Sequence, residues 1–379
     1  MATDQPASPR IVSLDQFRGY TVLGMFFVNF VGSFAVIREV LPVFKHHHTY
    51  LSYADTIMPH FLFAVGFSYR LTFLRKLAAG ETTSAYMRVI RRNFGLFLLA
   101  FVVYPLNAQG WQAMSELGTP RYGEVLIQEF KHNLFQTLSH IALTSLWVLP
   151  VIASRQMVRF GFAVFSGMAH VGLSYWFNYT WSNTPPNSID GGPLGFLTWT
   201  IPLIAGTLAY DTWMAGSRSS AIGKCLVGGL VLVVIGYGLT CLTLAPSSHP
   251  DAQNGISVHV AEPPFVFVDK SPPDNNLFTV SQRSGSISYL VYGAGFSLVI
   301  YSLFILLSDV GGLQLGLFRT LGTNALAGYI IHDLISEAVK PYVPKDAPLW
   351  YVFSAFAVYF AICYLFLRTL EKQKIFLRL

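Results

Sequence analysis

The stretch SISYLVYGAGFSLVIYSLFILLS, Ser286–Ser308, decides the fold class because it runs for 23 residues without a charged side chain. A helix of about 20 apolar residues crosses the roughly 30 Å hydrocarbon core of a bilayer. The whole chain has the same character: 53% of its 379 residues are hydrophobic and 12% are charged, whereas about 25% of a soluble domain is charged. We therefore expect an all-α, polytopic integral membrane protein.

Nine further apolar runs resemble this one, so the sequence predicts about ten transmembrane helices in a single domain over residues 1–379. The expected spans are Tyr20–Leu41, Thr56–Leu77, Arg92–Leu106, Leu134–Ala153, Met157–Asn178, Leu194–Met214, Ile222–Leu244, Ser286–Ser308, Leu321–Val339 and Leu349–Leu370. Between the seventh and eighth spans, residues 245–285 contain six prolines and scattered charges. This composition predicts a long outer loop and not a helix.

Lysine and arginine gather at the ends of the apolar runs. With the N-terminus inside, alternate loops place 17 of the 25 basic residues on one side and 8 on the other. By the positive-inside rule, both ends of the chain are expected in the cytoplasm. Orientation in a membrane thus explains the net charge of +6, and no nucleic-acid partner is needed. We expect no removable signal peptide, and we expect a protein of the bacterial inner (plasma) membrane.

The three cysteines, Cys225, Cys241 and Cys363, lie inside apolar runs and have no CxxC or metal-ligand spacing. We therefore expect neither a disulfide framework nor a metal site.

Histidines provide the first candidate site. His46, His47 and His48 are adjacent on the loop expected outside, and Asp55 follows at the start of the second span. An imidazole with a pKa near 6.5 can take a proton from an amine or a hydroxyl at neutral pH. A carboxylate such as Asp55 could orient that imidazole. A hydrated turn with an acidic helix cap explains the same residues without chemistry, and both interpretations stay open.

Polar residues within or beside the spans provide further candidates. Asn29 lies in the first half of the first span, among apolar neighbours, where an amide without a partner would cost a few kcal/mol. An interhelical hydrogen bond and a substrate contact are both open for it. In the ninth span, Asn324, His332 and Asp333 are functional candidates, because polar and ionisable groups are rare inside a membrane.

Arginines mark the cytoplasmic ends of two spans. Asp15 and Arg18 lie three residues apart on one helical face, which is typical of a helix anchored at the interface. Arg91 and Arg92 begin the third span and could bind the phosphates of a soluble donor. Positive-inside anchoring explains them equally well.

Five motifs occur in order along the chain. They are SLDQFRG at Ser13–Gly19 followed by Val28-Asn29, ADTIMPHFLFAVG at Ala54–Gly66, LFQTLSHIA at Leu134–Ala142, NLFT at Asn276–Thr279 and GTNAL at Gly322–Leu326. Together they resemble the heparan-alpha-glucosaminide N-acetyltransferase family of transmembrane acyltransferases and its bacterial relatives. Thr137 stands where that family usually has an arginine.

The resemblance implies transfer of an acetyl-type group from cytoplasmic acetyl-CoA to a sugar amine or hydroxyl at the outer face. Acetyl-CoA, or another acyl-CoA, would be a co-substrate and not a permanently bound cofactor. His46 or His47 would be the general base or a transient acyl carrier, Asn29 would bind the acyl carbonyl or the oxyanion, and Asp55 would orient the histidine. Direct transfer in a ternary complex and an acyl-histidine intermediate both stay open.

The remaining candidates have binding roles. We expect Arg18, Arg91 and Arg92 to hold the phosphates of CoA, and Gln136, Asn324, His332 and Asp333 to contact the substrate. The expected partners are the lipid bilayer, acyl-CoA and a sugar or glycan acceptor, with a homodimer left open. One alternative is a secondary transporter of a small solute that uses Asn29, Asn324, His332 and Asp333 as its relay. Another is a lipid or glycan binding module without turnover.

Overall fold

The computed structural model describes residues 11–48, 50–104, 123, 127, 129–242, 261, 263–266 and 276–377, and within these residues the chain is all-α. Its helices are α1 (Val12–Val31), α2 (Ala35–Val40), α3 (Tyr53–Ala78), α4 (Thr82–Val103), α7 (Thr137–Val148), α8 (Gln156–Leu173), α9 (Tyr179–Asn183), α10 (Phe196–Ala215), α11 (Arg218–Cys241), α12 (Ile287–Phe304), α13 (Gly316–Thr323), α14 (Ala325–Val339) and α15 (Leu349–Lys372). Much of the expected outer loop, 245–285, lies outside the described residues.

Six helical segments in the described part of the chain are long and apolar enough to cross a membrane. They are Tyr53–Ala78, Gln156–Asn183, Gly192–Ala215, Arg218–Cys241, Ile287–Val310 and Leu349–Lys372. Each overlaps one expected span. The four other expected spans overlap α1, α4, α7 and α14, which are shorter or more polar. An all-α chain with apolar, membrane-length helices is thus confirmed, and it indicates an integral membrane protein.

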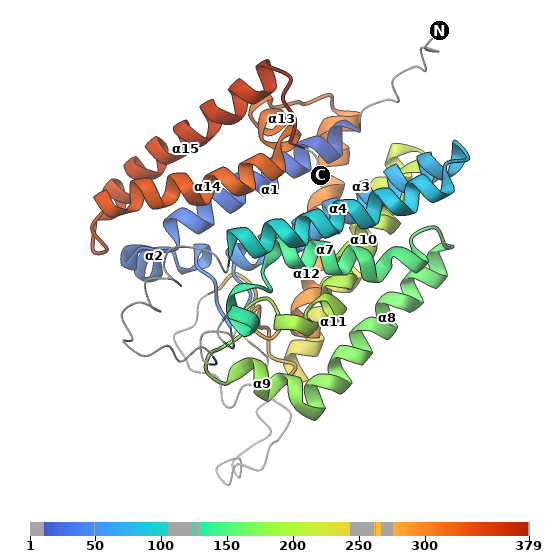
Figure 1. Cartoon of the computed structure of the whole chain (residues 1–379), viewed down its shortest axis with the longest axis horizontal. Helices are drawn as coiled ribbons and strands as arrows, with labels where there is room; N and C mark the ends of the chain where they lie inside the picture. The colour runs from blue at the N-terminus through green and yellow to red at the C-terminus, as the bar shows by residue number, and fades with distance from the viewer. Residues whose placement is uncertain are drawn as a thin grey trace.

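Successive long helices alternate between two ends of the molecule. We call one the histidine end, where α1 stops and α3 starts, and the other the arginine end, where α1 and α4 start. In Figure 1, α14 and α15 lie beside α1 on one side, whereas α4, α7 and α8 lie on the other. The first described stretch begins at the arginine end with α1. The last described stretch returns to this end, where Asn324 bonds to the backbone of Ile375 and Leu377.

Glycines allow the central helices to approach closely. A Cβ atom added to Gly66 of α3 would lie 1.8 Å from the carbonyl oxygen of Leu203 in α10. One added to Gly206 of α10 would lie 2.0 Å from the carbonyl oxygen of Phe63. Since lipid tails are as apolar as the side chains, close backbone packing of this kind is a main source of helix association in a bilayer. It fixes α3, which carries Asp55, against α10.

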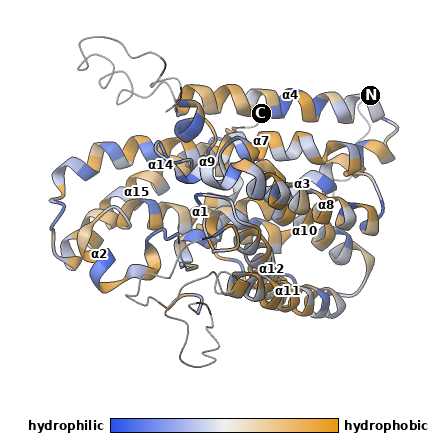
Figure 2. Cartoon of the chain, turned by 90° about the horizontal axis from the view of Figure 1, so that it is seen from below, coloured by the Kyte–Doolittle hydropathy of each residue, from blue (hydrophilic) through white to orange (hydrophobic). Residues whose placement is uncertain are grey.

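Apolar side chains cover much of the outer surface of the long helices. Val234 of α11, Phe165 of α8 and Leu365 of α15 are each more than half exposed. Figure 2 shows this apolar character along α11 and α8. Exposed apolar surface on this scale would be unfavourable in water and is the surface that lipid covers.

The first helix differs from its expected span. It runs from Val12 to Val31 instead of from Tyr20 to Leu41. Its polar first turns are satisfied inside the protein, because Asp309 accepts hydrogen bonds from the backbone N and the hydroxyl of Ser13 at 3.0 and 2.7 Å. The prediction that Asn29 lies in the first half of the helix is therefore wrong: Asn29 is in its last turn, at the histidine end.

Candidate functional site

The start of α3 builds the carboxylate of the site. Ser52 is the N-cap residue, and its hydroxyl accepts a hydrogen bond from the backbone N of Asp55 at 3.3 Å. In return Asp55 Oδ2 accepts from the backbone N and the hydroxyl of Ser52 at 3.1 and 2.8 Å. This is a capping box, so the cap is Ser52 and Asp55 occupies the third helical position. Asp55 is 2% exposed and is fixed in one orientation.

His46 lies directly on this carboxylate. Its Nδ1 donates a hydrogen bond to Asp55 Oδ1 at 2.9 Å, while 42% of the His46 side chain remains exposed. Burial lowers the pKa of His46, but the hydrogen bond to Asp55 and the charges of Asp55 and Asp190 outweigh it and raise that pKa. With Nδ1 occupied, Nε2 is the nitrogen that can take a proton, which is the arrangement of a carboxylate-oriented general base.

The two neighbouring histidines are placed differently. His47 Nε2 donates to the carbonyl oxygen of Pro42 at 3.2 Å, and its ring packs at 4.4 Å from that of Tyr50. Burial is the main reason that the pKa of His47 is lowered. Burial, aided by the positive charge of Arg283, lowers the pKa of His48 to about 4. Of the candidates His46 and His47, His46 is thus the one whose side chain pairs with the carboxylate.

Asp190 is a second carboxylate at this site, and the sequence interpretation did not include it. It lies in the loop between α9 and α10, is 3% exposed and has a φ of +54°. Its Oδ1 accepts a hydrogen bond from Gln282 Nε2 at 2.7 Å. Asp190 and Gln282 both act on His46. The only sequence signal was local: Asp190-Gly191-Gly192 predicts a turn, but nothing in it indicates proximity to Asp55.

Asn29 forms an interhelical hydrogen bond, one of the two roles expected for it. Its Nδ2 lies 3.1 Å from His332 Nε2 in α14. Since His332 Nδ1 donates to the carbonyl oxygen of Tyr329 at 2.5 Å, Nε2 of the neutral ring accepts from the Asn29 amide. Asp333 Oδ1 lies 3.2 Å from the same Nε2. Lys340 Nζ donates to the backbone oxygen of Asn29 at 3.1 Å.

Asn29 and His46 lie at the same end, but the structure forms no hydrogen bond between these two described residues. The carbonyl oxygen of Tyr329 fixes the ring of His332, the partner of Asn29. The hydroxyl of Tyr329 bonds to that of Tyr104 at 2.5 Å. The histidine end therefore has two polar clusters, one around His46 and one around Asn29.

Gln136 and Asn324 were both expected to bind substrate. Gln136 is the N-cap residue of α7 at the histidine end, next to Thr137, whose hydroxyl lies 3.8 Å from Met58 Sδ. Asn324 lies instead at the arginine end. Its Nδ2 donates to the carbonyl oxygen of Ile375 at 2.9 Å, and its Oδ1 accepts from the backbone N of Leu377 at 3.2 Å. The structure therefore separates Asn324 from His332 and uses its amide to hold the C-terminal tail.

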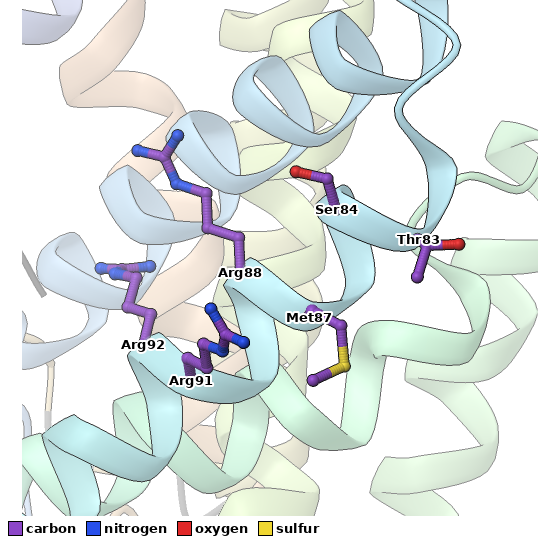
Figure 3. A pocket seen from close by; sticks show the side chains of 6 residues that line it. All are labelled: Thr83, Ser84, Met87, Arg88, Arg91 and Arg92. Atoms are coloured by element: carbon purple, nitrogen blue, oxygen red, sulfur yellow. The ribbon is translucent and has the colours of Figure 1, made fainter.

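The arginine end has an open pocket of about 500 Å³. It is lined by Thr83, Ser84, Met87, Arg88, Arg91 and Arg92. Figure 3 shows that all six side chains come from the first half of α4. The positive charges of Arg18 and Arg88 act on Arg92, so four arginines share this region. Within the described residues no ion pair forms to Arg88, Arg91 or Arg92, and this surface suits an anionic ligand.

No protein-family model and no curated protein sequence matches the chain.

Proposed function

We propose that this protein is a membrane acyltransferase that moves an acetyl-type group from acyl-CoA to a sugar amine or hydroxyl. The observation that carries the proposal is the pairing of His46 Nδ1 with the buried Asp55 carboxylate at 2.9 Å, with the imidazole partly exposed. A carboxylate that holds Nδ1–H fixes the tautomer in which Nε2 is the base.

Nε2 of His46 takes part in both possible routes of the proposed reaction. In direct transfer, the acceptor nitrogen or oxygen attacks the thioester carbon, Nε2 takes the acceptor's proton, and the C–S bond breaks to release the CoA thiolate, which that proton can neutralise. In the alternative route, Nε2 itself attacks the thioester and the thiolate leaves. The acceptor then attacks the acyl-imidazole, the bond from the acyl carbon to Nε2 breaks and restores the histidine, and the proton that the acceptor loses neutralises the CoA thiolate. Both routes require the same nitrogen and the same orientation by Asp55.

The donor would enter from the arginine end. A nucleotide thioester carries several phosphate charges, and guanidinium groups bind phosphates in bidentate fashion. The guanidinium groups of Arg91 and Arg92 line the open pocket and form no ion pair within the described residues, which supports this assignment. The expected orientation, with 17 of 25 basic residues in the cytoplasm, would put this pocket on the side where acyl-CoA is found.

Asn29 would polarise the acyl carbonyl. His332 accepts from one amide hydrogen of Asn29, which leaves the second for a carbonyl oxygen or the oxyanion that develops from it. Because Asn29 and His46 share no hydrogen bond in the structure, the substrate itself would bridge the two clusters. Gln136, His332 and Asp333 at the histidine end would surround the acceptor.

The direct test is transfer of radiolabelled acetyl from acetyl-CoA to amino sugars by the purified protein. We expect His46→Gln to lower the rate by about 10²–10⁴-fold and Asn29→Ala to lower it by about 10–10³-fold. Asp346→Asn changes an exposed carboxylate at the same end and is the control. His47→Gln should stay within a few-fold of the wild type.

Two outcomes would overturn the proposal in different ways. Equal activity of the wild type and the His46→Gln and His47→Gln variants would remove the histidine assignment. A wild-type protein that binds no acetyl-CoA in calorimetry would contradict the proposal that the protein is an acyltransferase.

The second candidate function is a secondary transporter. The contact of Asn29 with the buried His332, whose Nε2 also lies 3.2 Å from Asp333 Oδ1, favours it, because such polar groups serve transporters as relays. Asn324, however, is bonded to the tail and cannot belong to that relay as placed. Uptake of an amino sugar into proteoliposomes without acyl-CoA would support the transporter. If no uptake occurs without acyl-CoA, the transporter is excluded.

A further inference from the structure

Helix α4 carries exposed positive charge at the arginine end. Arg88 and Arg91 are exposed there, and Arg92 beside them is half-buried. All three line the open pocket, and Figure 3 shows their side chains leaving the same stretch of the helix. In the part of the chain that the structure describes, no ion pair and no hydrogen bond forms to these guanidinium groups. This surface therefore attracts an anion.

The acidic residue at the start of α4 does not neutralise the arginines. Glu81 is the N-cap residue, and its Oε2 accepts a hydrogen bond from Lys76 Nζ at 2.5 Å. Glu81 and Lys76 thus form a neutral pair beside the pocket. Thr83 adds a hydroxyl donor to the pocket wall. Guanidinium and hydroxyl groups together are the donors that bind a phosphate.

Apolar side chains continue the same face of α4 toward the histidine end. Phe94, Leu98 and Phe101 are 47–60% exposed. With Met87 and Arg91 they recur every three or four residues, which is the spacing of one helical face. The opposite face of α4 packs against α7 and α3, and Figure 2 shows α4 along the edge of the molecule. The face that carries Arg91 therefore turns away from the protein and, in a bilayer, toward lipid.

The length of this apolar face fits one leaflet of a bilayer. Between positions 91 and 101 a helix rises about 15 Å, at about 1.5 Å per residue. Half of the hydrocarbon core, which is roughly 30 Å thick, has the same length. A lipid with its phosphate at Arg91 could therefore lay its acyl chains over Phe94 and Leu98 as far as Phe101.

We infer that this face of α4 binds an anionic phospholipid from the leaflet at the arginine end. Arg88 and Arg91 hold its phosphate, and Phe94, Leu98 and Phe101 contact its acyl chains. The inference goes beyond the proposed function and does not depend on it. Because the proposed donor also uses Arg91, a bound lipid phosphate would have to leave that arginine before the phosphates of the donor bind there.

Charge alone would suit a soluble phosphate compound equally well. The continuous apolar face favours a lipid, because Met87 already lines the pocket and Phe94 follows Arg91 by less than one turn. General attraction to an anionic membrane surface would involve every exposed cation at this end. Arg155, just before α8, and Lys224, near the start of α11, are exposed cations of this kind. Neither of them lines the pocket.

Native mass spectrometry of the purified full chain in a neutral detergent tests the inference. The protein is mixed with equal amounts of phosphatidylglycerol and phosphatidylcholine that have the same acyl chains, and the bound lipids are counted. We expect the wild type to retain phosphatidylglycerol about tenfold better, because its anionic phosphate pairs with two guanidinium groups. The double variant Arg88→Gln/Arg91→Gln should lose this preference. The control Arg155→Gln/Lys224→Gln removes two charges outside the pocket and should keep it.

Two further measurements identify the ligand as a lipid. The double variant Phe94→Ala/Leu98→Ala keeps the arginines and removes apolar contact area, so it should retain severalfold less phosphatidylglycerol than the wild type. Glycerol 3-phosphate has the phosphate but no acyl chains, and at the same concentration it should not displace the lipid.

Three results would overturn the inference. They are a wild type without preference for phosphatidylglycerol, equal losses in the two charge-removing double variants, and displacement of the lipid by glycerol 3-phosphate. The first would exclude an anionic lipid, the second would indicate diffuse attraction, and the third would make the pocket a site for soluble phosphates. Acetyl-CoA is left out of every mixture, so these results leave the proposed function untested, and its failure would leave the lipid site unchanged.

Discussion

At the scale of one residue, the buried negative charge of Asp190 lowers the stability of the fold. Burial raises its pKa from the usual 3.8 to about 6. Because the folded pKa is above the unfolded one, the stability that the protonated carboxyl provides is fully present below pH 3.8 and is lost as the pH rises through 6. Above that value the fold carries a charge that it would be more stable without.

This predicts a pH-dependent effect of Asp190→Asn on thermal unfolding. At pH 8 the variant should melt higher than the wild type, by roughly a few degrees, because asparagine keeps the bond to Gln282 and removes the buried charge. At pH 4 the two proteins should melt together, since Asp190 is then protonated. Differential scanning calorimetry in detergent measures this difference. A variant that is less stable at both pH values would show that the charge stabilises the fold.

The sequence predicted part of this site because part of it is local. His46 and Asp55 are nine residues apart, and a histidine loop before an acidic helix start could be recognised directly. Asp190 was missed because it is distant in the chain and occurs in a glycine turn that has its own structural explanation. Asn324 was assigned to the substrate because it is a polar residue inside the expected ninth span, but tertiary packing brings the C-terminal tail to its amide.

At the scale of helices, the crossing of α3 and α10 depends on two glycines. The Cβ of an alanine at position 66 would lie 1.8 Å from a backbone oxygen of α10, so the helices would have to separate. Since α3 carries Asp55 and the loop before α10 carries Asp190, this crossing also sets the distance between the two carboxylates.

We therefore predict that Gly66→Ala destabilises the protein by about 1–3 kcal/mol, the usual cost of overpacking. Gly223→Ala in α11 is the control, because a Cβ there meets nothing within 4 Å. It should be neutral or stabilising by up to about 1 kcal/mol, as expected for alanine in a helix. Unfolding followed by tryptophan fluorescence compares the two. Equal effects of both substitutions would contradict the packing argument.

Helix α1 illustrates what hydropathy alone misses. The apolar run suggested a start at Tyr20, yet the helix begins at Val12 because Asp309 and the backbone of Leu315 satisfy the polar groups of Ser13 and Gln16. Those partners are about 300 residues away in sequence, so no local pattern could reveal them. The existence of the helix was predictable, and its register against the site was not.

At the scale of the whole molecule, the two candidate sites lie at opposite ends. The His46 cluster is at the histidine end, and the Arg91 pocket is at the arginine end. In the described part of the chain, six long apolar helices lie between these ends, in keeping with a bilayer. The fold class followed from the composition and the long apolar runs. The crossing of ten spans remains a prediction from those runs, and the cytoplasmic location of both termini remains a prediction from the charge distribution.

This arrangement leads to the central claim, that an acyl group passes from a donor on one side of the membrane to an acceptor on the other. Proteoliposomes with the protein in one known orientation test it directly. Glucosamine is enclosed in the lumen that faces the histidine end, and radiolabelled acetyl-CoA is added outside at the arginine end. We predict acetylated sugar in the lumen, and none in vesicles that contain His46→Gln. Labelled product formed only when donor and acceptor share one side, or no product at all, would contradict the account.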